Sequence, residues 1–296
     1  MAAEIRVLNE ARPAGDVSRD LQRLMNRMKG EHMVAGGRGV DYEALRDSEL
    51  FKDYLWRTLE LRSVDLSTLQ DAGEKKAFFI NIYNALNIHG LVQCKQLPSS
   101  VLDVRQFWKT TAYNIGGVNF SLDDIEHGIL RGNRPHPSSR DCPFKKDDPR
   151  LRFSLETLDP RIHFSLVCGA KSCPAISVYS GENVDRALTA AAKGFCEQEV
   201  VVDMKRKEIS LSKIFQWYRS DFGKDDIEAV RWTLPYLSED KQYGVESLLS
   251  TLEQEGGVSI LYSEYNWHLN DTEIILTPQQ ARYKMLGVPL EDVDTL

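Results

Sequence analysis

The sequence contains no uninterrupted apolar run long enough to cross a bilayer. Residues 1–16 carry charges throughout and contain no apolar core of the secretory type. Basic residues are not in excess either, since 37 Lys+Arg stand against 44 Asp+Glu, a net charge of -7. A nucleic-acid partner is therefore disfavoured, because such binding relies on positive charge at the phosphates. We expect no membrane span and no secretory signal.

Cysteine is sparse as well. Five cysteines in 296 residues are an odd number at low density, which is not the pattern of a disulfide-stapled secreted domain. Short-spaced ligand pairs of the C-x-x-C or H-x-x-x-H type are missing, so the sequence predicts neither a metal nor a cofactor. Together these absences predict a soluble protein of the reducing cytoplasm.

The chain is long enough to bury one substantial core, and its N-terminal part is distinct in composition. Residues 17–29 place apolar side chains at helical spacing, and a glycine-rich stretch follows at 35–39. We therefore predict an N-terminal helix and linker over 1–39 and a main domain over 40–296. The helix would pack on the domain or bind a protein partner.

Helical patterns dominate the main domain, and the strands are short and scattered. An almost wholly apolar stretch over 74–94 predicts a central buried helix. Hairpins are expected around Gly116-Gly117 and around the basic tip Lys205-Arg206-Lys207, and a closing strand over 259–268. This pattern predicts an α+β fold, a helix-rich single domain around a small mixed or antiparallel sheet.

The stretch with the clearest chemical signal is 161–178, RIHFSLVCGAKSCPAISV. Its run from Ile162 to Val167 has strand composition and contains His163. Cys173 stands directly before Pro174, and Pro suits the first position of a helix. A cysteine at such a start favours the thiolate because of the unpaired N–H groups there. The structural alternative is that Cys168 and Cys173 are packed as small apolar residues.

A cysteine nucleophile needs a base, a group that orients the base, and donors for an oxyanion. His127 and His163 are the candidate bases, although either can equally be a hydrogen-bonded structural histidine. The candidate orienting groups and donors lie inside recognisable motifs: Glu126, Asp124, Asn81 and Asn84, with backbone N–H groups at Ser172 and Cys173. The asparagines have a structural alternative, in which their amides tie loops to the central helix.

Several segments resemble one family, Domain of Unknown Function 547 (DUF 547). They are AFFINIYNALNIH at 77–89, GGVNFSLDDIEHGILR at 116–131, RIHFSLVCGAKSCPAI at 161–176, LSKIFQWYRSDFG at 211–223 and YNWHLN at 265–270. These blocks occur in the order of the family and span about 40–270. The resemblance implies little about activity; some plant members are similar to proteins described loosely as electron carriers.

The sequence thus favours a cysteine-dependent hydrolase or acyl transferase acting on an amide, ester or thioester of a small molecule or peptide. Distant kinship with papain-like and transglutaminase-like folds is part of this hypothesis, although the cysteine precedes the histidine in papain. Two alternatives remain. The domain can serve as a protein-interaction scaffold without catalysis, or Cys168 and Cys173, separated by four residues, can form a redox pair.

Overall fold

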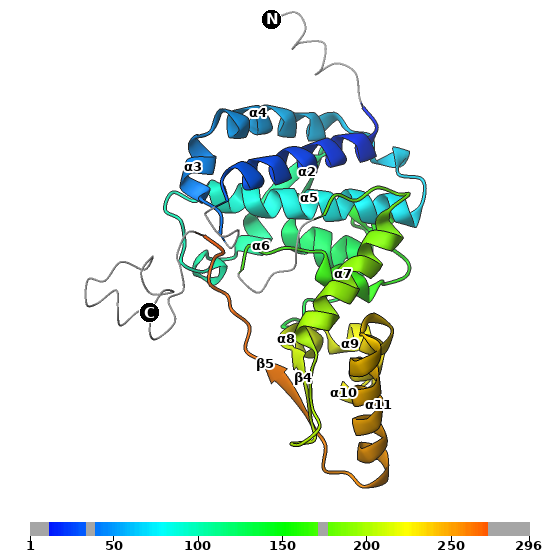
Figure 1. Cartoon of the computed structure of the whole chain (residues 1–296). Coiled ribbons are helices and arrows are strands. Elements are labelled where there is room, and N and C mark those ends of the chain that lie inside the picture. The colour runs from blue at the N-terminus through cyan, green and yellow to red at the C-terminus, as the bar shows by residue number, and fades with distance from the viewer. Residues whose placement is uncertain (1–11, 34–38, 171–176, 272–296) are drawn as a thin grey trace, which may run out of the picture.

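A computed structural model describes residues 12–33, 39–170 and 177–271 of the chain (Figure 1). Helices dominate, and two small sheets accompany them, which confirms the α+β prediction. The α-helices are α2 (Ala14–Glu31), α3 (Tyr42–Asp47), α4 (Glu49–Thr58), α5 (Ala72–Val92), α6 (Phe107–Thr110), α7 (Val184–Glu199), α8 (Lys213–Trp217), α9 (Arg219–Phe222), α10 (Asp226–Thr233) and α11 (Glu239–Gln254). The sequence pattern over 278–296 predicts a helix followed by a tail, and these residues lie outside the described ones.

The shorter elements complete the chain. Single 3₁₀ turns are η1 (Leu59–Ser63), η2 (Leu66–Thr68), η3 (Val101–Asp103), η5 (Pro149–Phe153), η6 (Pro160–Phe164) and η7 (Leu234–Tyr236), and η4 (Asp124–Leu130) is π-helical. The strands are β1 (Ala112–Ile115), β2 (Val118–Ser121), β3 (Val201–Asp203), β4 (Glu208–Ser212) and β5 (Ser259–Ser263). Within the described ranges no helix is both long and apolar enough to cross a membrane.

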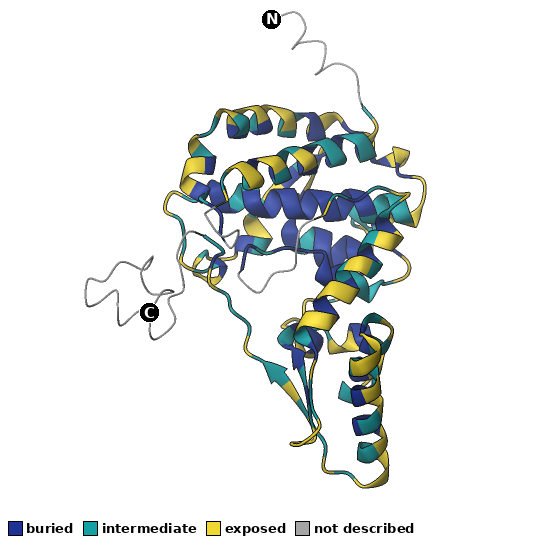
Figure 2. Ribbon diagram, in the orientation of Figure 1, coloured by how far each residue is buried: buried dark blue, intermediate teal, exposed yellow. Residues whose placement is uncertain are grey.

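Helix α5 is the centre of the larger of two hydrophobic cores (Figure 2). It is apolar on nearly every side, and most of its residues are buried, as predicted. Asp71 caps its start by accepting a hydrogen bond from Glu74 N at 2.8 Å. Helix α2 lies along α5 and buries its apolar face, including Leu21, Met25 and Met28, in this core. That face of the N-terminal helix is therefore already occupied within the chain.

The first sheet is the predicted hairpin. β1 and β2 pair antiparallel, with Ile115 opposite Val118. Gly116 and Gly117 have φ of 57° and 84°, the left-handed region that a two-residue hairpin turn requires. A side chain at Gly116 would also meet the carbonyl oxygen of Val64 at 2.8 Å. The hairpin thus lies close against the segment that precedes α5.

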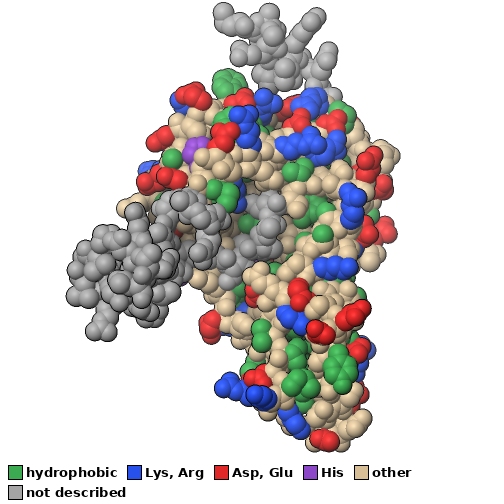
Figure 3. Space-filling view, in the orientation of Figure 1, with side chains coloured by type: hydrophobic (Ala, Val, Ile, Leu, Met, Phe, Trp, Pro, Cys, Tyr) green, Lys and Arg blue, Asp and Glu red, His purple; other side chains and the backbone are tan. Residues whose placement is uncertain are grey.

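The second sheet belongs to a separate, smaller core with α8 to α11. β3 and β4 form an antiparallel hairpin, and β5 adds to β4 in parallel. Helix α7 runs between the two parts of the molecule (Figure 1). On the face shown in Figure 3, acidic and basic side chains are interspersed.

Two predictions for strands are wrong. The apolar run 162–167 is not a strand: residues 160–164 form the 3₁₀ turn η6, capped by Asp159, which accepts from Arg161 N. Pro160 at its first position starts the turn. Ile162 packs in the larger core and Phe164 in the smaller one, so the run is apolar without being a strand. The closing strand is also shorter than predicted, since β5 ends at Ser263.

Candidate functional site

The asparagines of α5 hold the segment that contains the sequence CGAKSC at both of its ends. Asn84 accepts from Val167 N at 2.9 Å and donates to Ser165 O at 2.9 Å. Asn81 binds the backbone N and O of Tyr179 in the same way, at 2.9 and 2.8 Å. The oxygen and the nitrogen of each amide therefore both bind backbone groups. This is the structural alternative for these residues, in which their amides tie loops to the central helix. Neither side chain belongs to the histidine cluster described next.

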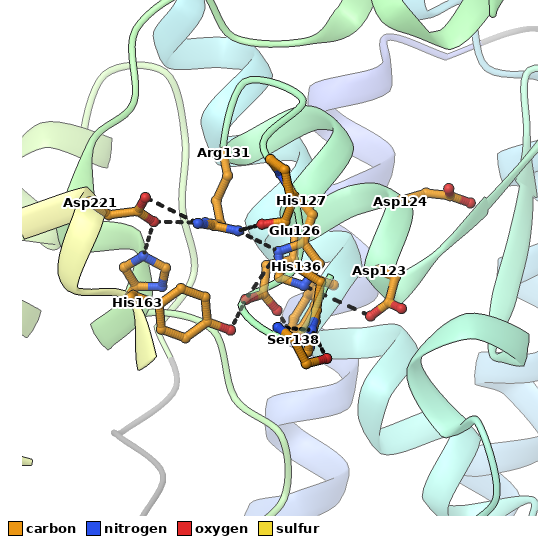
Figure 4. A network of polar contacts seen from close by, with 12 residues as sticks. Asp123, Asp124, Glu126, His127, Arg131, His136, Ser138, His163 and Asp221 are labelled. Carbon is orange, nitrogen blue, oxygen red and sulfur yellow. Dashed lines mark hydrogen bonds and ion pairs between the residues drawn. The ribbon is translucent and has the colours of Figure 1, made fainter. Parts of the chain in front are cut away.

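His163 and Asp221 form a buried pair (Figure 4). His163 Nε2 lies 2.9 Å from Asp221 Oδ2, and their side chains are 2% and 0% exposed. Burial alone would raise the pKa of Asp221, but hydrogen bonds from His163 and Arg131 hold it well below its usual value. The ionised carboxylate can only accept, so His163 carries its proton on Nε2. In the neutral ring this leaves the lone pair on Nδ1, which makes no hydrogen bond to another described residue.

Arg131 connects this pair to the second histidine. Its Nε and one terminal nitrogen donate to both oxygens of Asp221, at 2.7 and 3.0 Å. Its other terminal nitrogen lies 2.9 Å from His127 Nδ1 and 2.7 Å from Pro135 O. Arg134, which is far more exposed, adds a contact of 3.2 Å to Asp221. The carboxylate therefore receives donors from three side chains in a buried site.

His127 is a neutral imidazole in this arrangement. A guanidinium cannot accept a hydrogen bond, so His127 Nδ1 is the acceptor and the ring proton is on Nε2. Burial is the main reason that the pKa of His127 is lowered to about 4; Glu126 opposes this shift, and Arg131 adds to it. Nε2 faces Asp123 at 4.0 Å. Burial and the charge of Glu126 raise the pKa of Asp123 to about 6.

Glu126 is buried between two tyrosines. It accepts from Tyr83 Oη at 3.0 Å and from Tyr218 Oη at 2.6 Å. Its nearest approach to His127 Nδ1 is 3.9 Å. Burial alone would raise the pKa of Glu126, but His127 and the Tyr218 hydroxyl lower it below its usual value. Its carboxylate is thus held by phenol groups, and the Tyr218 ring lies 4.0 Å from the ring of His163.

The π-helical turn η4 sets the positions of these side chains. Its backbone bonds run from residue i to i−5, as in Arg131 N to Glu126 O at 2.8 Å, which widens the turn. Ser121 and Asp124 form a reciprocal cap at its start, at 3.1 and 2.9 Å. Asp124 also pairs with Arg150 at 2.8 Å and points away from His127 (Figure 4). Asp123 is the acidic residue that faces His127.

The cysteines are placed only in part. Cys168 is half-buried, and its Sγ lies 3.6 Å from Tyr265 Oη. Gly169, directly after it, has φ of 82°, so the chain turns there. Ser172 and Cys173 lie outside the described residues. The described residues include no group of three or more His, Cys, Asp or Glu side chains that fits a metal ion.

Of the predicted site residues, the structure gathers His127, His163 and Glu126 into one network and leaves Asn81 and Asn84 outside it. Sequence reasoning missed Asp221, Arg131 and Tyr218. Asp221 follows a run of aromatic residues at a helix end, and no spacing rule links it to His163, 58 residues earlier. The sequence pattern at Arg131 indicates only the basic end of a helix.

The fold and the site together define a class: an α+β protein in which a buried His–Asp pair joins two cores. A family model with the description "Protein of unknown function, DUF547" matches residues 66–196. Over these residues the chain belongs to the DUF547 family, as the resemblance in the sequence implied. Comparisons with curated proteins and with solved structures returned no match. Kinship with papain-like folds therefore stays a prediction.

Proposed function

We propose that the protein is a cysteine-dependent hydrolase or acyl transferase that acts on an amide, ester or thioester. Cys173 is the proposed nucleophile and His163 the base. His163 Nδ1 takes the thiol proton, the sulfur bonds to the carbonyl carbon, and the carbonyl electron pair moves to oxygen. Collapse of this adduct breaks the bond to the leaving group, which takes the proton from His163. Water or another acceptor then releases the acyl group in the same way.

One observation carries the proposal, the 2.9 Å hydrogen bond between His163 Nε2 and the ionised Asp221. It fixes the tautomer that leaves a basic nitrogen on the opposite edge of the ring, and it stabilises the imidazolium that forms during the reaction. His127 is the weaker candidate base because its Nδ1 already accepts from Arg131. In the sequence, Cys173 follows His163 by ten residues.

The test is the alkylation rate of each cysteine in the full chain against pH, with iodoacetamide and peptide mapping. We expect Cys173 to react with a midpoint well below the ordinary thiol value of about 8.5, and His163→Gln to move that midpoint towards it. Exposed Cys142 is the internal reference. Hydrolysis of p-nitrophenyl acetate should disappear in Cys173→Ala and persist in Cys142→Ala. A Cys173 midpoint equal to that of Cys142 would refute the proposal.

The same variants separate the alternatives. If Cys168→Ala rather than Cys173→Ala abolishes turnover, the nucleophile is the thiol beside Tyr265. If Cys168→Ser and Cys173→Ser each remove an oxidised form that differs in electrophoretic mobility, and no ester is turned over, the two cysteines form a redox pair and the protein is not a hydrolase. If all of these variants change only the free energy of unfolding, the domain is a scaffold.

A further inference from the structure

Four large aromatic side chains gather at the surface between the two cores without being fully buried. They come from three separate segments and form what we term the aromatic wall: Trp108, Trp217, Tyr265 and Trp267. All four are of intermediate exposure, whereas Phe164, Phe215 and Phe222 nearby are buried. The chain has five tryptophans in all, and three of them are in this wall. Such rings retain apolar surface that a ligand can cover.

The spacing of the rings determines which ligands the wall fits. The ring centroids of Trp217, Tyr265 and Trp267 lie 4.6 to 5.4 Å from one another. Rings at that spacing pack against each other and leave no room for a cation between them, unlike the separated faces of an aromatic cage. Trp108 extends the surface by an edge contact of 6.2 Å to Trp267. The wall is thus a continuous apolar surface.

One contact connects the wall to the segment that contains the proposed nucleophile. Tyr265 Oη lies 3.6 Å from the sulfur of Cys168, in the same segment as Cys173. Trp217 directly precedes Tyr218, whose ring stacks on His163 with 4.0 Å between centroids. The wall therefore lies beside Cys168, and one of its rings belongs to the chain neighbour of the tyrosine that stacks on His163.

One pair of opposite charges lies beside the wall. Lys213, one helical turn before Trp217 on α8, pairs with Glu264 at 3.4 Å. Glu264 is the neighbour of Tyr265 in the chain. An uncharged apolar substituent that lies on the rings gains the free energy of the area that it removes from water.

We propose that the aromatic wall binds the apolar part of an acyl substrate, so that the enzyme prefers carbonyl compounds with a medium-length aliphatic or aromatic acyl group over acetyl. This inference rests on the proposed function and narrows its substrate class. A fully buried methylene contributes about fourfold in affinity and a half-buried one about twofold. Three or four methylenes lying on the wall then give about a tenfold preference in kcat/KM.

The experiment compares p-nitrophenyl acetate, octanoate and 3-phenylpropanoate with the full chain, Trp267→Ala and Trp267→Phe. Trp56→Ala is the matched control, because Trp56 is 68% exposed on α4 and belongs to no ring contact of the wall. We expect the octanoate-to-acetate ratio of kcat/KM to be about ten, to fall close to one in Trp267→Ala, and to be largely kept in Trp267→Phe and Trp56→Ala. A preference for 3-phenylpropanoate alone would identify an aromatic acyl group.

A binding measurement tests the aromatic wall independently of ester hydrolysis. Octan-2-one has a carbonyl and an apolar chain but no leaving group, and its binding is followed by tryptophan fluorescence with butanone as the short reference. If the full chain and Trp267→Ala show the same chain-length ratio and the same octan-2-one affinity, the wall is not the acyl site. If no ester is hydrolysed but octan-2-one binding depends on Trp267, the proposed function is wrong and the apolar site stands.

Discussion

Arg131 and Asp221 are 90 residues apart in the sequence and form a bidentate ion pair with distances of 2.7 and 3.0 Å. Arg131 ends the π-helical turn on the larger core, and Asp221 belongs to α9 on the smaller one. The pair thus fixes the two cores relative to each other at the point where His163 lies. It also supplies the charge that keeps the carboxylate ionised.

Removal of Arg131 should destabilise the protein strongly. Arg131→Met leaves Asp221 buried without its main partner, which costs about 3–5 kcal/mol of the free energy of unfolding. Urea denaturation measures this change. Arg134→Gln is the matched control: Arg134 contacts the same carboxylate, but its side chain is 45% exposed, so the loss should stay below about 1 kcal/mol. Equal effects of the two variants would show that Arg131 does not anchor the cores.

Asp221→Asn tests the orientation of His163 within the proposed function. The amide can donate to Nε2 and so stabilise the other tautomer, with the proton on Nδ1. We expect kcat for p-nitrophenyl acetate to fall by about 10³-fold or more. The alkylation midpoint of Cys173 should rise at the same time. A variant that keeps full turnover while losing stability would make Asp221 purely structural.

Asn84 and Asn87 stand one turn apart on α5 and should respond in opposite ways to the same substitution. Both ends of the Asn84 amide bind backbone, so Asn84→Leu leaves two buried groups unpaired at a cost of about 2–4 kcal/mol. Asn87 is fully buried, and neither polar atom of its side chain has a hydrogen-bond partner in the described structure. Asn87→Leu should therefore be neutral or stabilising by about 1 kcal/mol. Thermal denaturation of both variants decides between these expectations.

Local signals explain what was predictable from the sequence. The cap at Asp41, which accepts from Ala44 N at 2.9 Å, and the Gly116-Gly117 turn depend on neighbours within a few residues. The run 162–167 was misjudged because a short apolar stretch does not distinguish a strand from a turn that enters two cores. Pro160 after Asp159 was the local sign of the turn.

The candidate site was predictable only in part, because local sequence signals indicate single residues and not their distant partners. The histidines and Glu126 stood in recognisable motifs, so they could be named as candidates. Their partners could not, because Asp221 and Tyr218 approach from the second core, and Tyr218 lies 92 residues from Glu126. The π-helical turn, which sets the direction of His127 and Arg131, has no signature in the residues that form it.

The half-buried His89 should make stability depend on pH. Burial lowers the pKa of His89 to about 4, against about 6.5 in the unfolded chain. Between these two pH values the unfolded state binds more protons than the folded state, so the free energy of unfolding rises with pH. The contribution of His89 is present above about pH 6.5 and is lost as the pH falls to about 4. The loss is at most about 3 kcal/mol. His89→Gln should remove its share of this slope in urea titrations across that range, and the remainder includes His127, whose pKa is also lowered to about 4. His268→Gln, a substitution at an exposed position, is the control.

Gly128 is the position where the π-helical turn tolerates no side chain. A Cβ there would lie 2.3 Å from the ring of buried Phe144, so Gly128→Ala should lower the free energy of unfolding by about 1–3 kcal/mol. Gly194 on α7 is exposed and has nothing within 4 Å of such an atom. Gly194→Ala should instead stabilise by about 0.5–1 kcal/mol. Adding Phe144→Leu to Gly128→Ala should recover part of the loss, because it removes the clash. If Gly128→Ala is as stable as the parent, Phe144 does not pack against the turn, and the positions of His127 and Arg131 have another cause.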